Sequence, residues 1–447
     1  MNKPKLFLIA SLLLASDGLW AQTHKWTLQE CLDYALENNI QLQQKRITTK
    51  SSHEDLLQSK GALLPSVSFS TNQNMNYRPF SEQTITLESG TMTASSNSVS
   101  YNGSYGINAN WTVWNGNRNH INIQQNELTE KQNEFAEQQQ ANSIQEQITQ
   151  LYVQILYENE AIKVSEEVLK ASELQRDRAK TMVEVGSLAR VDLAQLEAQV
   201  AQDQYSVVSA KSQLENYKLQ LKQLLEIHGE EEFDVVIPEI SDEKVLSMIP
   251  DQASVYNAAL ETRPEIQSNK LSIESSDLSI KSARAGYMPS ISLSASTGTS
   301  NGSAQNGNFA HQIKNNWSNA LGLSLSVPIF DQYSARTNIR KAKYARQSAE
   351  LQLKDTEKQL YSSIENYYLN ANTSQQQYIY AKKNVESMQE SYELVSEQFR
   401  LGLKNIVELT TGKNNLLQAE QQLLQTKYTT LLNQAMLRFY QGEPIQL

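Results

Sequence analysis

Two kinds of hydrophobic periodicity alternate along the chain. From Val99 to Val113 the odd positions are apolar or small, and every even position is Ser, Asn, Gly or Thr. A period of two, with one apolar face and one uncharged polar face, predicts a β-strand between two unlike surroundings. The same alternation occurs in three other stretches. The predicted strands are 63–77, 99–114, 288–300 and 317–330.

The polar face of these strands separates two interpretations. A strand of a soluble sandwich would normally carry Lys and Glu on its solvent face, whereas this face carries Ser and Asn. Aromatic residues lie near the strand ends, at Tyr77, Tyr101, Trp111 and Trp114, which is typical of the girdles of membrane strands. The pattern therefore favours strands that meet lipid on one face and water on the other. The polar stretch 78–98 is predicted to be an exposed loop.

Elsewhere the period changes to that of a helix. Residues 26–61 have apolar residues at helical spacing, with Thr27 as N-cap and Glu30 three residues later. In 117–228 and 332–440 the apolar residues recur in alternating steps of three and four, which is the seam of a coiled coil. These two stretches are predicted to be helical hairpins. At about 1.5 Å per residue, the first of their helices would be roughly 100 Å long.

Each predicted hairpin turns at a short sequence that contains glycine. The first, GSLARVDL, runs from Gly186 to Leu193, and the second, GLKNIVEL, runs from Gly402 to Leu409. Both place Gly, Val, an acid and Leu at matching positions, and LPSVSFS in the first half returns as MPSISLS in the second, which indicates a tandem duplication. The predicted organisation is a first repeat 22–228 with its tip at 185–191, a connector 229–264, and a second repeat 265–447 with its tip at 401–407.

The start of the chain predicts export. Residues 1–21 have the layout of a secretory signal peptide, with Lys3 and Lys5 before an apolar run and Ala21 at its end. A single cysteine, Cys31, cannot form an internal disulfide, and we expect it to be a buried thiol on the first helix. No later apolar run approaches the roughly 20 residues of a membrane helix, so a membrane would have to be crossed by strands.

Composition and motifs argue against several classes of function. The net charge is −10, and no basic cluster is evident, which argues against a nucleic-acid partner. The five histidines lie far apart, and no metal-binding or catalytic motif occurs. An enzymatic activity, a metal site or a cofactor is therefore not predicted.

Four strands of this kind require partners. A four-stranded sheet cannot stand alone in lipid, because both of its edges would expose unpaired backbone groups. Closure must come from further copies of the chain, which predicts a multiple of four strands. Ser and Asn would line a wet interior, and long helices leaving the same end would continue it as a tube. We therefore expect a conduit rather than an active site.

The chain resembles the TolC-type outer membrane efflux channels over essentially all of its mature sequence. The resemblance rests on the opening WTLQECLDYALENN, the LPS and MPS that begin two strands, the VPIFD that ends another, and the two turns. It implies a mixed fold, a membrane β-barrel continued by an α-helical barrel, in which three identical chains give four strands each to a twelve-stranded barrel. It also implies the outer membrane of a Gram-negative bacterium, a periplasmic adaptor protein, and an inner-membrane pump of the RND or ABC type.

The resemblance further assigns roles to residues at the two tips. A periplasmic gate would use Asp192 and Lys404 as a closing pair between neighbouring helix pairs, with Phe399 where a tyrosine would offer a hydroxyl. Glu408 would be an entrance acid that binds cations, with Thr411 in the place of a second acid. Both acids also fit the ordinary preference for negative charge in the first turn of a helix. The residues that dock the adaptor would be Gly186, Ser187, Leu188, Gly402 and Leu403.

Two other classes of protein share some of these features. One is a periplasmic coiled-coil adaptor, and the other is an exported structural protein whose coiled coils oligomerise. An adaptor would have one hairpin inserted in compact β-domains, whereas this chain has two predicted hairpins and four two-faced strands. Recovery from the soluble periplasm without detergent would contradict the channel interpretation.

Overall fold

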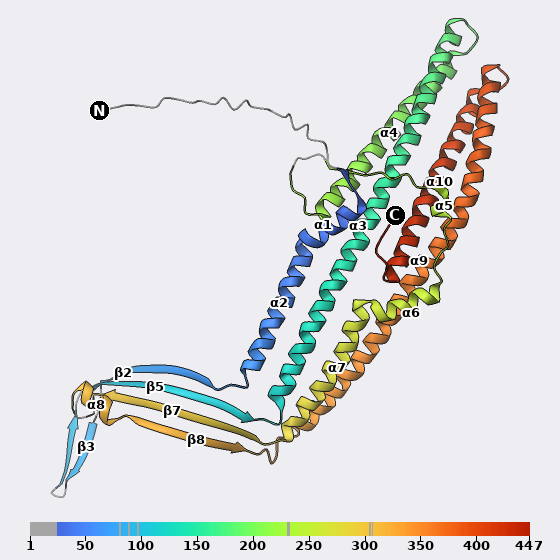
Figure 1. Cartoon of the computed structure of the whole chain (residues 1–447). Coiled ribbons are helices and arrows are strands. Elements are labelled where there is room, and N and C mark those ends of the chain that lie inside the picture. The colour runs from blue at the N-terminus through green and yellow to red at the C-terminus, as the bar shows by residue number, and fades with distance from the viewer. Residues whose placement is uncertain are drawn as a thin grey trace, which may run out of the picture. The chain divides into compact units, whose positions relative to one another are not determined.

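The computed structural model describes residues 25–79, 82–87, 90–95, 98–229, 233–303, 305 and 307–447 (Figure 1). The predicted signal peptide, 1–21, lies outside the described residues and stays a prediction. Two compact units make up the described chain. The hairpin unit comprises the chain up to Leu42, Ala141–Ala259 and Ser362–Leu447, and the strand unit comprises Gln43–Gln140 and Leu260–Tyr361. Each unit therefore contains residues from both predicted repeats.

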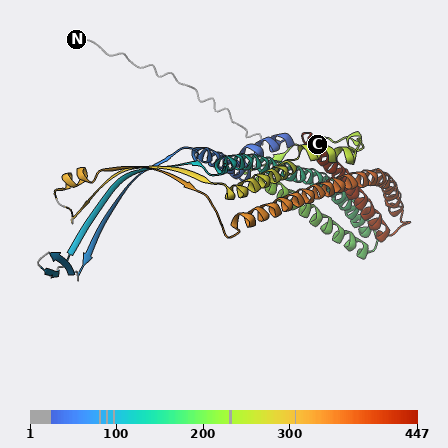
Figure 2. The same cartoon turned by 90° about the horizontal axis from the view of Figure 1, so that it is seen from below.

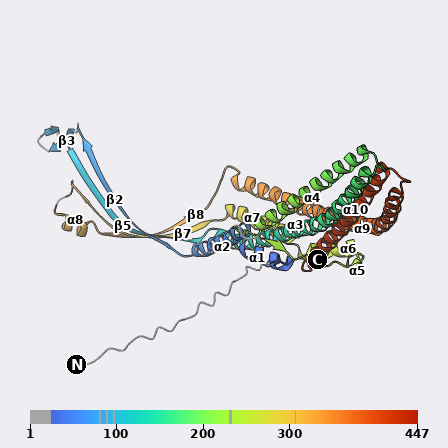
Figure 3. The same cartoon turned by 90° about the horizontal axis from the view of Figure 1, so that it is seen from above.

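The strand unit contains a four-stranded antiparallel sheet in the order β2-β5-β7-β8 (Figures 1 and 3). Its strands are β2 (Ser66–Arg78), β5 (Ser98–Trp114), β7 (Ser290–Gly302) and β8 (Ser318–Ser326). The register aligns like residues across all four strands. One cross-strand row is Val67, Ala109, Ala295 and Leu321, and the next is Ser66, Asn110, Ser294 and Gly322. Because successive residues point to opposite faces, the sheet has one apolar and one polar face.

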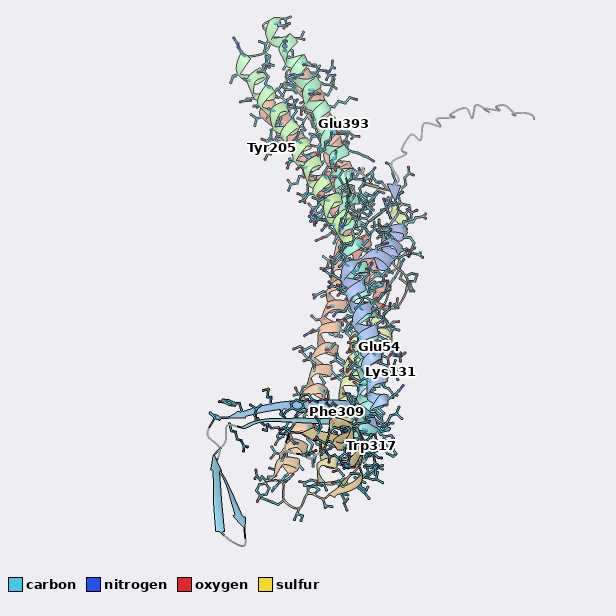
Figure 4. All side chains as sticks on the ribbon, turned by 90° about the vertical axis from the view of Figure 1, so that its left-hand side faces the viewer. Glu54, Lys131, Tyr205, Phe309, Trp317 and Glu393 are labelled. Carbon is cyan, nitrogen blue, oxygen red and sulfur yellow. The ribbon has the colours of Figure 1, made fainter. Side chains whose placement is uncertain are left out.

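The apolar face of the sheet is uncovered within a single chain. Val67, Phe69, Leu321, Leu323 and Leu325 are all exposed. A contiguous apolar surface of this kind is a site for lipid or for another chain. At the end of the sheet away from the long helices, the aromatic side chains of Phe309 and Trp317 are also exposed (Figure 4).

The connections between strands contain more structure than the sequence suggested. The stretch 78–98, predicted to be a loop, includes the strands β3 (Glu82–Leu87) and β4 (Gly90–Ser95), which pair as an antiparallel hairpin. That prediction was wrong because the Thr and Ile residues in this stretch have a strand preference. The connection after β7 contains the helix α8 (Phe309–Asn315). β8 ends before the predicted limit of 330, since Pro328 cannot donate to a strand ladder.

Besides α8, the strand unit contains helices that adjoin the ends of the four long strands. They are α2 (Ile40–Gly61), the first part of α3 (Arg118–Glu184), α7 (Pro264–Arg284), the short helix η1 (Ala285–Tyr287) and the first part of α9 (Ser334–Arg400). Polar contacts join neighbouring pairs. Arg46 of α2 contacts Glu137 of α3 at 3.1 Å, and Gln125 of α3 donates to Ser279 of α7 at 2.9 Å. Figure 4 labels Glu54 on α2 and Lys131 on α3.

Two long helical hairpins make up most of the hairpin unit (Figures 1 and 2). One pairs α3 with α4 (Arg190–Leu224), and the other pairs α9 with α10 (Ile406–Tyr440). The remaining elements are α1 (Leu28–Asn38), α5 (Asp242–Val245), α6 (Gln252–Thr262), and β1 (Lys25–Trp26) paired in parallel with β6 (Asp234–Val235). Within the described ranges, no helix is both long and apolar enough to cross a membrane.

The first predicted helix, 26–61, is two helices divided at Asn39. Thr27 and Glu30 form the expected capping box at the start of α1. Asn39 then adopts an extended conformation, and its side chain accepts from the N–H groups of Gln41 and Leu42, which caps α2. Cys31 is fully buried on α1, as expected, and this burial raises the pKa of its thiol to about 12.

Candidate functional site at the two hairpin tips

Both tips end their first helix with the same cap. Gly186 and Gly402 have φ angles of 75° and 74°. The next residue in each tip donates its N–H to the carbonyl five residues earlier, at 2.8 Å for Ser187 and 2.9 Å for Leu403, which is the Schellman arrangement. No atom lies within 4 Å of an added Cβ at either glycine, so the backbone conformation alone requires glycine.

The second helix of each tip begins differently. α4 follows Ala189, whose side chain makes no capping hydrogen bond. α10 follows Asn405, which accepts from the N–H of Glu408 at 3.0 Å, while the Glu408 carboxylate accepts from the Asn405 N–H at 3.2 Å. This capping box makes Glu408 a structural part of the second tip.

The predicted gate residues have these positions in a single chain. Lys404 forms an ion pair with Glu408, and this contact, followed by the bond from the Asn405 backbone, holds the pKa of Glu408 below its usual value. Asp192 lies half-buried in the first turn of α4, and no ion pair between described residues includes it. The predicted Asp192–Lys404 pair would join neighbouring helix pairs, so it stays a prediction.

Phe399 is part of a small hydrophobic cluster below the tips. The cluster has four buried members, and five partly buried residues pack against it. The buried members are Ala179, Leu196, Ile406 and Leu409, and the surrounding residues are Leu188, Leu193, Tyr392, Val395 and Phe399. Its residues come from all four long helices. The cluster therefore holds the two hairpins together close to the tips, and Phe399 and Leu188 both contribute to that packing.

Thr411 lies at a polar groove between α4 and α10. The groove has a volume of about 370 Å³, and the residues that line it carry no charge. The Thr411 hydroxyl donates to the Val407 carbonyl at 2.7 Å. Among the described residues, no group of three His, Cys, Asp or Glu side chains could hold a metal ion.

A buried ion pair below the cluster was not identified from the sequence. Lys413 of α10 contacts Asp203 of α4 at 2.5 Å, and the two side chains are only 3% and 7% exposed. Ser172 of α3 donates to Asp203 at 2.6 Å and accepts from Lys413 at 2.8 Å, and Gln199 donates to the other Asp203 oxygen at 2.8 Å. Burial lowers the pKa of Lys413, an effect that the contact with Asp203 opposes. We call these four residues the buried polar network.

One position in the sequence indicated that a buried charge would need a partner. Asp203 occupies a coiled-coil seam position between Val200 and Val207, where a charged residue must have a partner. Lys413 gives no such signal, because its partners lie on helices far away in sequence. A second missed contact is at Tyr392, whose hydroxyl accepts from Gln175 of α3 at 2.7 Å.

A third polar contact joins the connector to the second hairpin. Asp242 of α5 accepts from the Tyr378 hydroxyl at 2.5 Å and pairs with Lys382, both on α9. The hydrogen bond from Lys382, and then that from Tyr378, hold the pKa of Asp242 below its usual value. These contacts attach the connector to a helix that ends at the second tip.

Comparison with known proteins identifies the class as outer membrane efflux proteins. A profile described as outer membrane efflux protein matches residues 31–226 and 255–443. The chain therefore belongs to the outer membrane efflux protein family. It is a protein of the outer membrane of Gram-negative bacteria and extends into the periplasm.

Sequence relatives are similar over part of their length. Outer membrane protein TolC of Escherichia coli is 27% identical over 273 residues, which are 58% of this chain and 53% of that protein. TolC of Salmonella enteritidis is 24% identical over 278 residues, 60% of this chain and 54% of that protein. Alkaline protease secretion protein AprF of Pseudomonas aeruginosa is 23% identical over 184 residues, 41% of this chain and 37% of that protein. The alignments thus span about half the length of the TolC relatives.

Solved structures match over nearly the whole chain. A structure of CusC aligns with a TM-score of 0.79 at 14% identity and covers 93% of this chain and 92% of that one. The Campylobacter jejuni CmeC outer membrane channel aligns with a TM-score of 0.76 at 19% identity, over 94% and 87% of the two chains. The fold is therefore that of the outer membrane channels.

Proposed function

We propose that the chain is the outer membrane channel of a tripartite efflux or type I secretion system. It would be a passive conduit that carries substrate from a periplasmic adaptor and an inner-membrane pump, of the RND or ABC type, to the cell exterior. The observation that carries this proposal is the two-faced sheet, apolar on one side and lined with Ser and Asn on the other, on a chain with two long hairpins. A periplasmic coiled-coil adaptor would not require a sheet with one apolar face and one uncharged polar face.

A homotrimer with a twelve-stranded barrel is part of this proposal. In the sheet of one chain, β2 and β8 each have one neighbour, so both edges require pairing. The helices also have uncovered apolar residues in a single chain. Tyr205 on α4, which Figure 4 labels, is exposed, as are Val208 on α4 and Tyr380 on α9. Neighbouring copies would cover them. Three copies would close the sheet, and the helices would form a periplasmic tube.

The tips would be the periplasmic mouth of this tube. Leu403 is 72% exposed, and it lies where a hairpin tip would dock an adaptor, together with Gly186, Ser187, Leu188 and Gly402. Asp192 and Lys404 would close the mouth between neighbouring helix pairs. In that state Lys404 would be shared between Asp192 and Glu408, because one ammonium can donate to both acids.

The test uses the full chain, expressed with the predicted signal peptide 1–21. The protein should fractionate with outer membranes, migrate as a trimer after crosslinking, and form channels in planar bilayers. A photocrosslinker at Leu403 should capture a periplasmic adaptor in cells, whereas one at the exposed Met248 in the connector should not. Recovery from the soluble periplasm without detergent, or a protein without conductance in bilayers, would contradict the proposal.

A further inference from the structure

A basic groove lies between α7 and α9 of the strand unit, next to the helix ends that adjoin the sheet. Its volume is about 580 Å³. The lining consists of four cationic side chains, one acid and two other residues. They are Lys281, Arg284, Lys343 and Arg346, then Asp277, and then Ile280 and Gln347. Arg284 ends α7 six residues before β7 begins, so the groove lies close to the strands.

The groove holds cationic side chains that the chain itself does not neutralise. Arg346 is committed to Asp277 at 2.6 Å and also contacts Glu350. Lys281, Arg284 and Lys343 are exposed, and no ion pair between described residues includes them.

The surrounding sequence strengthens this local charge. Residues 336–346 carry five Lys or Arg residues and no acid, so the expectation that the chain has no basic cluster was wrong. Residues 336–346 form a basic stretch that is visible in the sequence itself, whereas Lys281 and Arg284 join it only in the fold, because they lie on α7. The local positive charge favours an anionic ligand.

An exposed apolar segment connects the sheet to the groove. Between the end of β8 and the start of α9, Ile329 is 97% exposed, Phe330 73% and Tyr333 62%. The rings of Phe330 and Tyr333 meet edge to face, with centroids 5.8 Å apart. Asp331 accepts from the Ala335 N–H at 2.6 Å and so fixes where α9 begins. Aromatic and apolar side chains followed by Lys and Arg are typical of the boundary between lipid and water.

We propose that this groove binds the phosphate headgroup of an anionic phospholipid in the periplasmic leaflet of the outer membrane. Lys281, Arg284 and Lys343 would donate to the phosphate oxygens, because Lys and Arg form charge-assisted hydrogen bonds with phosphate. The acyl chains would lie toward Ile329 and Phe330. The inference rests on the proposed membrane crossing by the sheet and goes beyond it, because it assigns a lipid site with no part in conduction.

Binding is tested with the solubilised full chain and labelled phosphatidylglycerol. The wild-type protein should bind phosphatidylglycerol saturably and bind zwitterionic phosphatidylcholine far more weakly. In the triple variant Lys281→Gln/Arg284→Gln/Lys343→Gln, affinity for phosphatidylglycerol should fall roughly 100-fold, at about fivefold per cation near a lipid surface. The matched control Lys354→Gln/Lys358→Gln/Lys383→Gln removes the same charge from exposed positions elsewhere on α9 and should bind like the wild type.

Competitors identify the source of the phosphate. Glycerol phosphate and inorganic phosphate should not displace the lipid at millimolar concentration, because they lack acyl chains. Displacement by either would assign the groove to a free phosphate, and displacement by soluble cell-wall fragments would assign it to the cell wall. Each result would overturn the lipid site, as would equal binding of the two lipids by the wild type or an equal loss in the control.

Conductance separates this inference from the proposed function. The triple variant should form channels of unchanged conductance, since its side chains lie outside the predicted gate. A wild type that conducts without preferring phosphatidylglycerol would refute the lipid site alone. Circular dichroism and trimer migration of the variant confirm its fold, and the comparison of the two lipids on the wild type needs no variant.

Discussion

The buried polar network allows a quantitative prediction about what joins the two hairpins. Lys413→Met would remove the ammonium and leave the Asp203 carboxylate buried without its counter-charge. Breaking one side of a buried ion pair costs about 3–5 kcal/mol. Ser172 and Gln199 still donate to Asp203, and bonds to a charged group are worth about 1.5–3 kcal/mol each. We therefore expect the lower end of the range, about 3 kcal/mol.

The double variant separates charge from packing. In Asp203→Leu/Lys413→Met both charges are gone, and apolar side chains of similar volume replace them. Replacing a buried ion pair in this way is often neutral or stabilising. The double variant should therefore be at least as stable as the wild type, and much more stable than Lys413→Met alone. With Asp203→Leu measured as well, the double-mutant cycle gives the coupling energy between Asp203 and Lys413.

Hydrogen exchange of the full-length protein is the appropriate assay, because it reports local opening of α4 and α10 without global unfolding. A loss of about 3 kcal/mol should speed exchange near Asp203 and Lys413 roughly 100-fold. The exposed Lys383→Met on α9 is the control and should change exchange little. A loss below about 1 kcal/mol in Lys413→Met, or a double variant as unstable as the single, would refute the reasoning.

Three further predictions concern the tips and the connector. Asp192→Ala with Lys404→Ala should raise single-channel conductance in planar bilayers; unchanged conductance would remove both from the gate. Glu408→Gln should weaken block by divalent or trivalent cations added from the periplasmic side, and equal block would leave Glu408 with its capping role alone. Because the folded state lowers the pKa of Asp242, its contact with Lys382 should stabilise α5 above about pH 4 and weaken as pH falls further. Hydrogen exchange of α5 should show this loss in the wild type, and an identical pH profile in Asp242→Asn would contradict it.

Local patterns were enough to predict the sheet and the tips. Alternation along β5 and β7 predicted a two-faced sheet, because a strand's faces are set by its own sequence. The glycines at 186 and 402 predicted the turns, because only a positive φ ends a helix in that way. The capping role of Glu408 was also readable, since Asn405 lies three residues before it. The family resemblance assigned Glu408 to a cation site at the entrance instead.

Contacts between distant segments could not be predicted from the sequence. Lys413 pairs with Asp203 across a sequence distance that no periodicity describes, and the basic groove combines Lys281 with Lys343 from separate helices. The division at Asn39 depended on one side chain capping the next helix, which competed with an otherwise continuous helical pattern.

The pairing of β5 with β7 has a consequence for the ancestry of the assembly. In this chain the last long strand of the first half pairs with the first strand of the second half. In a closed ring of copies, β8 would meet β2 of the next chain in the same relation. The chain thus contains, within itself, the same kind of strand pairing that is expected between subunits. A ring of six half-length ancestors would need only that one type of strand pairing between subunits. Fusion of two halves would place every second such pairing within a single covalent chain.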